Sequence, residues 1–189
     1  MRIFLAVFPP PAVQADVYAA AERLKRPGDG VSWVKRENLH YTLRFLGELG
    51  EDGARRVKEA ADDAARPLPR FGAALGALGA FPSPRRARVL WVGMTEGAES
   101  LEALARALDS GLARRGFGAP DHPFSAHLTI GRVRDPRSDW GERLGAIQLA
   151  PGASRFDVDR LCVVESRLSP RGSTYIVVQE TELAPADNP

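Results

Sequence analysis

Two four-residue segments of this chain, His40-Tyr41-Thr42-Leu43 and His127-Leu128-Thr129-Ile130, follow one pattern and contain two of its three histidines. On an extended strand, residues two positions apart point to the same face. The His and the Thr of each segment therefore share a face, and the apolar residues face the opposite way. The pattern predicts two strands that bury their apolar sides and present paired imidazole and hydroxyl groups to one cleft.

The segments around these motifs predict alternating strands and helices. Apolar residues recur at helical spacing in three segments, at 11–24, 52–65 and 100–115. Apolar and β-branched runs bounded by turn residues predict strands at 2–8, 31–34, 39–46, 71–78, 88–94, 126–133, 157–168 and 174–180. A similar series of strands and helices therefore occurs twice, with one His-x-Thr strand in each half.

This order of elements predicts an α+β fold with two related halves, each with an antiparallel sheet and outer helices. We expect residues 1–189 to form a single bilobal domain with the active-site cleft between the lobes, because sites tend to form in such clefts. The tail at 184–189 is expected to fray.

Composition and charge limit the function classes. The net charge of +2 is too small for a protein that coats nucleic acid, so RNA contact would need a local cluster such as Arg85, Arg86 and Arg88. A solvated loop is the alternative for that cluster. The single cysteine, Cys162, lies in an apolar run, which indicates a buried thiol and a reducing compartment. With no apolar run of membrane-spanning or signal-peptide length, and no long exposed apolar stripe, we expect a cytoplasmic monomer that does not contact a membrane.

The paired motifs suit acid-base chemistry on a phosphate. An imidazole with an ordinary pKa near 6.5 can be neutral in one copy and charged in the other, so one takes a proton and the other gives one. The Thr42 and Thr129 hydroxyls can donate to phosphate oxygens and hold phosphorus between the two imidazoles. No carboxylate lies within either motif, which favours an anionic substrate.

A metal site is an alternative that the histidines leave open. His40, His122 and His127 could together hold a catalytic zinc ion. The partner two residues after each motif histidine is a threonine, which is a poor zinc ligand, so we expect no metal and no cofactor.

Several segments resemble a known family. Residues 37–48, Glu-Asn-Leu-His-Tyr-Thr-Leu-Arg-Phe-Leu-Gly-Glu, resemble the first signature of the two-histidine phosphoesterases, and more narrowly of the RNA 2′,3′-cyclic phosphodiesterases, also called 2′-5′ RNA ligases. The segments 2–7, 89–93, 123–124 and 165–175 are similar as well. Two positions depart from the family pattern: Ala126 stands where a proline is usual, and Tyr41 where an aliphatic residue is usual. We expect the Tyr41 ring to pack in the core with its hydroxyl reaching a partner.

The resemblance implies metal-free hydrolysis of a 2′,3′-cyclic phosphate on RNA or a nucleoside to a 2′-phosphate. It implies that His40 is the general acid, that His127 is the general base, and that Thr42, Thr129 and Arg132 bind the phosphate. RNA ends, including tRNA fragments, are the implied partners. The alternatives are a 2′-5′ RNA ligase that acts on cleaved tRNA ends and a non-catalytic protein that binds RNA ends.

The position of Arg132 conflicts with a regular strand, because its parity directs it away from the cleft. Gly131 offers a solution, since glycine in a strand often marks a bulge that re-aims the next side chain. We therefore predict a distortion of the strand between His127 and Arg132.

Four further residues are candidate substrate contacts. Arg44 shares the parity of His40 and could be an outer phosphate contact or a solvated strand residue. Tyr175 could contact the substrate from the last strand pair. Phe8 and Trp33 lie near strand ends beside the first motif and could stack on a nucleobase or pack in the core.

Overall fold

The computed structural model describes residues 1–134, 138–149, 154–170 and 172–186. The helices are α1 (Pro11–Leu24), α2 (Glu51–Ala65), α3 (Ala98–Ala113) and the short α4 (Gly141–Gly145). The strands are β1 (Arg2–Val7), β2 (Val31–Trp33), β3 (Tyr41–Glu48), β4 (Phe71–Phe81), β5 (Val89–Glu96), β6 (Leu128–Val133), β7 (Arg155–Val158), β8 (Arg160–Ser169) and β9 (Gly172–Glu182). The three long helices and both motif strands begin and end within two residues of the predicted bounds, and His40 and His127 directly precede β3 and β6.

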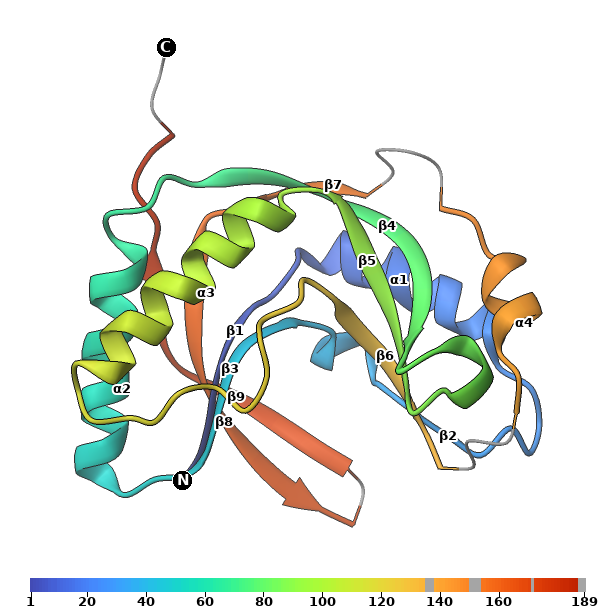
Figure 1. Ribbon diagram of the computed structural model, residues 1–189, viewed down its shortest axis with the longest axis horizontal. Helices are drawn as coiled ribbons and strands as arrows, with labels where there is room; N and C mark the ends of the chain where they lie inside the picture. Colours follow the sequence, from blue (N-terminus) through green and yellow to red (C-terminus); the bar gives the residue numbers. More distant parts are fainter. Residues whose placement is uncertain (135–137, 150–153, 171, 187–189) are drawn as a thin grey trace.

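The strands form a curled antiparallel sheet in the order β7-β4-β5-β6-β3-β1-β8-β9, with β2 paired to β6 (Figure 1). At its centre the two motif strands, β3 and β6, are joined through one residue pair, Tyr41 and Leu128. The sheet therefore consists of two groups of strands that meet at the motifs, one with β7, β4, β5, β6 and β2 and the other with β3, β1, β8 and β9. The expected α+β fold with two related lobes is confirmed, and its two sheets are continuous at this single pair.

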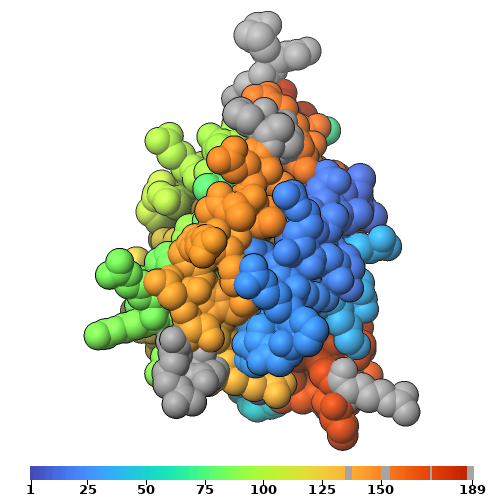
Figure 2. Space-filling model, turned by 90° about the vertical axis from the view of Figure 1, so that its right-hand side faces the viewer, coloured from blue at the N-terminus to red at the C-terminus, as the bar shows by residue number. Residues whose placement is uncertain are grey.

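Each lobe combines elements from both halves of the chain. Helices α2 and α3 lie side by side over the group that contains β3 and β8, whereas α1 and α4 contact the group that contains β6 and β4 (Figure 1). Figure 2 shows the orange surface around α4 lying directly against the blue N-terminal region. This contact includes an ion pair from Arg143 to Asp29 at 3.3 Å and a hydrogen bond from the Ser154 hydroxyl to Asp16 at 2.5 Å.

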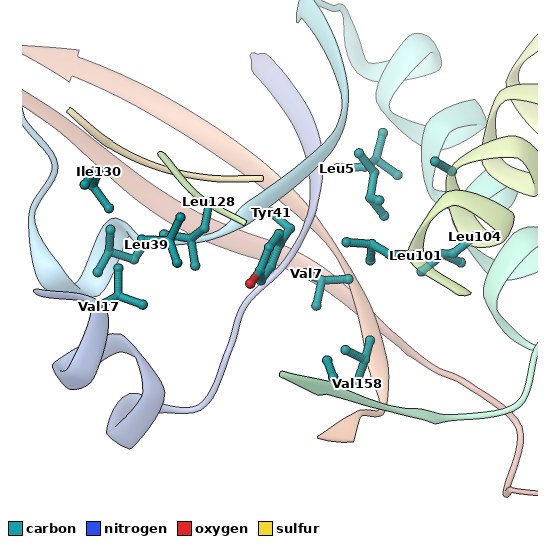
Figure 3. Close-up of a cluster of buried hydrophobic side chains, with 14 of the residues drawn as sticks. Leu5, Val7, Val17, Leu39, Tyr41, Leu101, Leu104, Leu128, Ile130 and Val158 are labelled. Atoms are coloured by element: carbon teal, nitrogen blue, oxygen red, sulfur yellow. The ribbon is translucent and has the colours of Figure 1, made fainter. Parts of the chain in front are cut away.

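The core explains why the motif strands are held so firmly. One face of α3 is fully buried through leucines at helical spacing, Leu101, Leu104, Leu108 and Leu112. Tyr41 and Leu128 lie in the same core, close to Leu39 and Val7 (Figure 3). Burial of large apolar side chains is the main favourable contribution to folding, so the apolar sides of both motif strands are anchored by the core.

Three segments differ from the sequence expectation. The strand predicted at 157–168 is two strands separated at Asp159, because β7 pairs with β4 at one end of the sheet and β8 pairs with β1 in the other lobe. Helix α4 was not predicted, since five residues carry no measurable period. The start of the tail is held, with the Ala184 amide donating to Leu68 O at 2.8 Å, while 187–189 lie outside the described residues.

Two other expectations concern the environment of the chain. Cys162 is buried as expected, and burial raises the pKa of its thiol to about 12. Among the described residues, no helix has the length and apolar character needed to cross a membrane.

Candidate active site

A pocket of about 410 Å³ opens where the two lobes meet. Its walls come from β1, β3, β6, the β8–β9 hairpin and the segments that lead into β3 and β6. It is lined by Arg2, Phe4, Val34, Asn38, His40, Thr42, Phe45, His127, Thr129, Arg132, Ser166, Leu168, Ser173 and Tyr175. The structure therefore brings together both motif histidines and both motif threonines, from segments far apart in the sequence.

The pairing of Tyr41 with Leu128 determines how the four motif groups are arranged. These two residues are buried, so their neighbours along each strand face the pocket. In an antiparallel register, this pair sets His40 beside Thr129 and Thr42 beside His127. Each imidazole thus has a hydroxyl next to it on the facing strand and another two residues along its own strand.

Backbone carbonyls select the tautomer of both histidines. Nδ1 of His40 lies 2.7 Å from Asn38 O, and Nδ1 of His127 lies 2.8 Å from Ser125 O. A carbonyl can only accept, so in both rings Nδ1 carries the proton and donates it. The Nε2 atoms then carry lone pairs on the pocket side. The Thr42 hydroxyl donates to Nε2 of His40 at 2.9 Å.

Aromatic rings pack against both imidazoles, more of them on the first. Phe4, Phe8 and Tyr175 surround His40, with ring centroids 4.9, 5.4 and 5.3 Å away. Phe81 packs edge-on against His127 at 5.1 Å. These contacts hold the rings and remove water from them.

The surroundings lower the pKa of both histidines. Burial is the main cause in each case, because it penalises the charged imidazolium. The Arg132 guanidinium acts in the same direction on both rings, whereas the hydrogen bonds to Asn38 and Ser125 oppose it. In the free protein, both imidazoles are therefore neutral near pH 7.

The predicted distortion of the second motif strand is present. Trp91 pairs with Thr129 and Leu90 with Gly131, so Ile130 is an additional residue on β6. This is a β-bulge, with two residues on one strand opposite one on the other. The extra residue is Ile130, one position before the glycine that was expected to mark it.

The bulge directs Arg132 into the pocket. Leu128 and Ile130 are buried before the bulge, whereas Gly131 and Val133 are buried after it. The exposed side chain of Arg132 consequently lies on the same side of the sheet as Thr129 and lines the pocket.

Gly131 has a separate structural role. A Cβ atom there would lie 2.7 Å from Cγ1 of Val31 and 3.1 Å from the Trp33 ring. A glycine is needed because β2 packs directly on this backbone.

The interpretation of Arg44 as a phosphate contact or a solvated residue is wrong in both forms. On β1, Leu5 pairs with Arg44 and Ala6 with Thr42, so Leu43 is an additional residue and the parity changes after it. Arg44 is 8% exposed, pairs with Asp109 at 2.9 Å and also donates to Gly118 O. Its guanidinium joins β3 to α3 and to the segment after it, away from the pocket.

The other candidate substrate contacts, Tyr175, Phe8 and Trp33, divide into two groups. Tyr175 lines the pocket, and Phe8 lines an adjacent hollow of about 400 Å³ that shares Asn38, Ser173 and Tyr175 with it. Trp33 lies in neither cavity and packs edge-on against Trp140 at 6.1 Å, so it is a packing residue. The ring of Tyr41 is buried as expected, but its hydroxyl has no hydrogen-bond partner among the described residues, and burial raises its pKa.

Sequence reasoning missed several residues that form the site. Asn38 is buried, donates through Nδ2 to Ser173 O at 2.9 Å, and provides the carbonyl that orients His40. Phe45 and Arg2 line the pocket because of the bulge in β3 and the pairing of β1 with β3. Strand parity alone places Phe45 on the opposite face, so only the bulge could have indicated it.

The described charged side chains that line the pocket are all positive. Arg2 and Arg132 line it, and no carboxylate does so among the described residues. In the same part of the chain, His40, His122 and His127 do not form a group that could hold a metal ion, nor do other His, Cys, Asp or Glu side chains. Cationic, hydroxyl and imidazole groups without a carboxylate suit an anionic phosphoester.

The doubled fold and this pocket together indicate a phosphoesterase. Comparison with known proteins gives the family: the model of LigT-like phosphoesterases matches residues 7–91 and again 92–175. This chain belongs to the LigT-like phosphoesterase family.

Curated relatives and solved structures agree with this assignment. A Methanothermobacter thermautotrophicus protein named RNA 2′,3′-cyclic phosphodiesterase is 35% identical over 178 residues, 93% of this chain and 95% of that protein. A Thermotoga maritima protein of the same name is 32% identical over 182 residues, 96% and 95% of the two chains. A crystal structure of a Thermus thermophilus protein has a TM-score of 0.80 at 29% identity and full coverage of both chains. E. coli LigT complexed with 3′-AMP has a TM-score of 0.77 at 25% identity, covering 96% of this chain and 97% of that one.

Proposed function

We propose that this protein hydrolyses the 2′,3′-cyclic phosphate at an RNA end, or on a nucleoside, to a 2′-phosphate. The observation that carries the proposal is the meeting of His40, His127, Thr42 and Thr129 in one pocket whose described lining includes no carboxylate. The names of the relatives and the nucleotide in the LigT structure support the choice of substrate class.

His127 acts as the general base in this proposal. Its Nδ1 proton is donated to Ser125 O, which leaves the Nε2 lone pair available to a water molecule. A lowered pKa keeps this ring neutral and able to accept a proton near neutral pH. Water attacks phosphorus, and its proton passes to Nε2 of His127.

His40 acts as the general acid. It must carry a second proton at Nε2, and the negative charge of a bound phosphate favours that imidazolium form. As the bond between phosphorus and O3′ breaks, the Nε2 proton passes to O3′. The products are a 2′-phosphate and a 3′-hydroxyl, and proton exchange with solvent restores both rings.

Three further residues hold the phosphate. The Thr42 and Thr129 hydroxyls donate to its non-bridging oxygens, and the Arg132 guanidinium compensates the charge that develops on them. Tyr175 and Phe8, beside His40, contact the ribose and base of the terminal nucleotide, which the hollow next to the pocket can accommodate.

The partners and setting follow from the same features. We propose that the protein acts as a monomer on RNA ends, including tRNA fragments, in the cytoplasm. The buried, unpaired Cys162 thiol supports a reducing compartment.

The test is hydrolysis of adenosine 2′,3′-cyclic phosphate by protein treated with EDTA. We expect turnover that leaves adenosine 2′-phosphate, identified by phosphorus NMR. A 3′-phosphate product, or dependence on added metal, would contradict the mechanism. Binding without turnover would instead indicate a protein that only recognises RNA ends.

A further inference from the structure

Phe45 is an unusual pocket residue because it is a large apolar ring in solvent. The exposed large apolar side chains of the described residues are Met1, Phe45, Leu168 and Val177, and two of these, Phe45 at 51% and Leu168 at 65%, line the catalytic pocket. Single exposed apolar residues are common, but two of them, Phe45 and Leu168, at one pocket indicate a surface that contacts an apolar part of a ligand.

The fold holds this ring in place. The bulge at Leu43 turns Phe45 to the same side of β3 as Thr42, and Phe45 pairs with Phe4 on β1. Phe45 lies three positions after Thr42 along β3, with the bulge between them, so its ring stands beyond the motif threonine along the strand. Among the described residues, the rings that contact His40 and His127 are those of Phe4, Phe8, Tyr175 and Phe81, and Phe45 is not one of them. The Phe45 ring is therefore placed to contact a part of the substrate beside the reacting phosphate.

Arg2 adds a positive charge at the same place. Its guanidinium carbon lies 5.0 Å from the centroid of the Phe45 ring, a cation–π contact. No ion pair to Arg2 is formed within the described residues, although the terminal amine next to it pairs with Glu48 at 3.4 Å. The guanidinium is thus positioned but not neutralised, as expected for a group that binds an anion.

We propose that Phe45 and Arg2 bind the nucleotide that precedes the cyclic end, so that the preferred substrate is an RNA chain and not a free nucleotide. This rests on the proposed function. Phe45 stacks on the base of that nucleotide, and Arg2 binds the phosphate that links it to the terminal nucleotide. Any base can stack on an aromatic ring, so the site favours substrates with a second nucleotide whatever the base of that nucleotide is.

The residues around His40 support separate positions for the terminal nucleotide and for the nucleotide before it. The terminal nucleoside must lie beside His40, which protonates its O3′, and the hollow lined by Phe8 and Tyr175 opens there. Phe45 lies five residues further along the chain from His40 and lines the pocket but not this hollow. A substrate with a second nucleotide can occupy both places, whereas a mononucleotide occupies one.

The experiment compares two substrates that end in the same group. One is adenosine 2′,3′-cyclic phosphate, and the other is the RNA dinucleotide ApA that ends in a 2′,3′-cyclic phosphate. The wild type should have the higher kcat/KM on the dinucleotide. Phe45→Leu should lose about tenfold more on the dinucleotide than on the mononucleotide, the size expected for one stacked base. Arg2→Gln should reduce the same preference severalfold and weaken its dependence on salt.

Phe117→Leu is the matched control. Phe117 also carries a guanidinium over its ring, that of Arg56 at 5.1 Å, but it does not line the catalytic pocket. This variant should keep the wild-type preference. Equal losses on both substrates in Phe45→Leu, or a wild type without preference, would overturn the proposal.

Failure of the proposed hydrolysis can be distinguished from failure of the proposal for Phe45 and Arg2. If the wild type hydrolyses neither compound, the proposed function fails, and binding provides the readout for the two residues. The His127→Ala protein should then bind the dinucleotide 2′-phosphate more tightly than adenosine 2′-phosphate by fluorescence titration, and adding Phe45→Leu should remove that difference. Equal affinities of His127→Ala for the two nucleotides would overturn the inference.

Discussion

The two motif strands have the same backbone design and different side chains. In both β3 and β6, an extra residue follows the motif threonine and reverses which side chains face the pocket. Two residues after the threonine stand buried Arg44 in β3 and Gly131 in β6. Three residues after it stand Phe45 in β3 and Arg132 in β6, both in the pocket. A duplicated backbone thus presents an aromatic ring from one lobe and a guanidinium from the other, which suits a substrate with a base at one end and a phosphate at the other.

Removal of either imidazole tests whether the two strands contribute equally to chemistry. His127→Ala and His40→Ala should each lower kcat by about 10²–10⁴-fold, because each removes one proton-transfer group. The measurement is the rate of hydrolysis of adenosine 2′,3′-cyclic phosphate at saturation. His122→Ala is the control, since His122 is exposed and outside the pocket, and it should keep full activity. A fully active His40→Ala or His127→Ala protein would reject the two-histidine mechanism.

Arg132 of β6, which stands where β3 has Phe45, tests the second difference between the two strands. Arg132→Gln should lower kcat/KM by roughly 10²-fold, since a donor to the developing charge is lost. Arg132→Lys should recover only part of this, because a lysine cannot donate two parallel hydrogen bonds. An effect on KM alone, with kcat unchanged, would show that the guanidinium binds substrate and transition state equally.

Arg44 should affect stability and not chemistry, in contrast to Arg132. Arg44→Met leaves Asp109 without its 2.9 Å partner and should lower the free energy of unfolding by about 2 kcal/mol, measured by urea denaturation. Arg55→Met is the matched control, because the ion pairs of Arg55 are exposed at the surface of α2 and it should unfold like the wild type. A stable Arg44→Met protein with weakened substrate binding would restore the phosphate-contact interpretation.

The smallest effect concerns pH. Both histidine pKa values are lowered, so kcat/KM should follow a bell with its maximum below pH 6.5, where the free enzyme still has one protonated ring. The maximum of kcat should lie at higher pH, because bound phosphate favours the imidazolium. A maximum of kcat/KM well above pH 7 would contradict the neutral rings of the free protein.

The same shifts have a consequence for stability. In the folded state both rings bind protons less readily than in the unfolded chain. Their contribution to the free energy of unfolding is therefore fully present above the unfolded pKa near 6.5. This contribution is lost as the pH falls from there through the folded values. His40→Asn should therefore make the denaturation midpoint less sensitive to pH below about 6.5.

The sequence predicted what depends on period and composition, and missed what depends on register. The motif histidines, the three long helices and the α+β fold follow from spacing that a single strand or helix displays. Arg44 and Phe45 were misplaced because a bulge reverses parity, and no residue in β3 marks it as Gly131 does near the bulge in β6. Trp33 could not be assigned, since only the pairing of β2 with β6 shows what its ring packs on.

The single Tyr41–Leu128 pair has a mechanical consequence. Within the described part of the chain, the reacting imidazoles flank the only strand pair that joins the sheets of the two lobes, so this pair can act as a hinge. A small change in the angle between the lobes displaces distant parts such as Leu168 much more than His40 and His127. We therefore expect substrates of different width at the mouth of the pocket to change the separation of His40 and His127 very little.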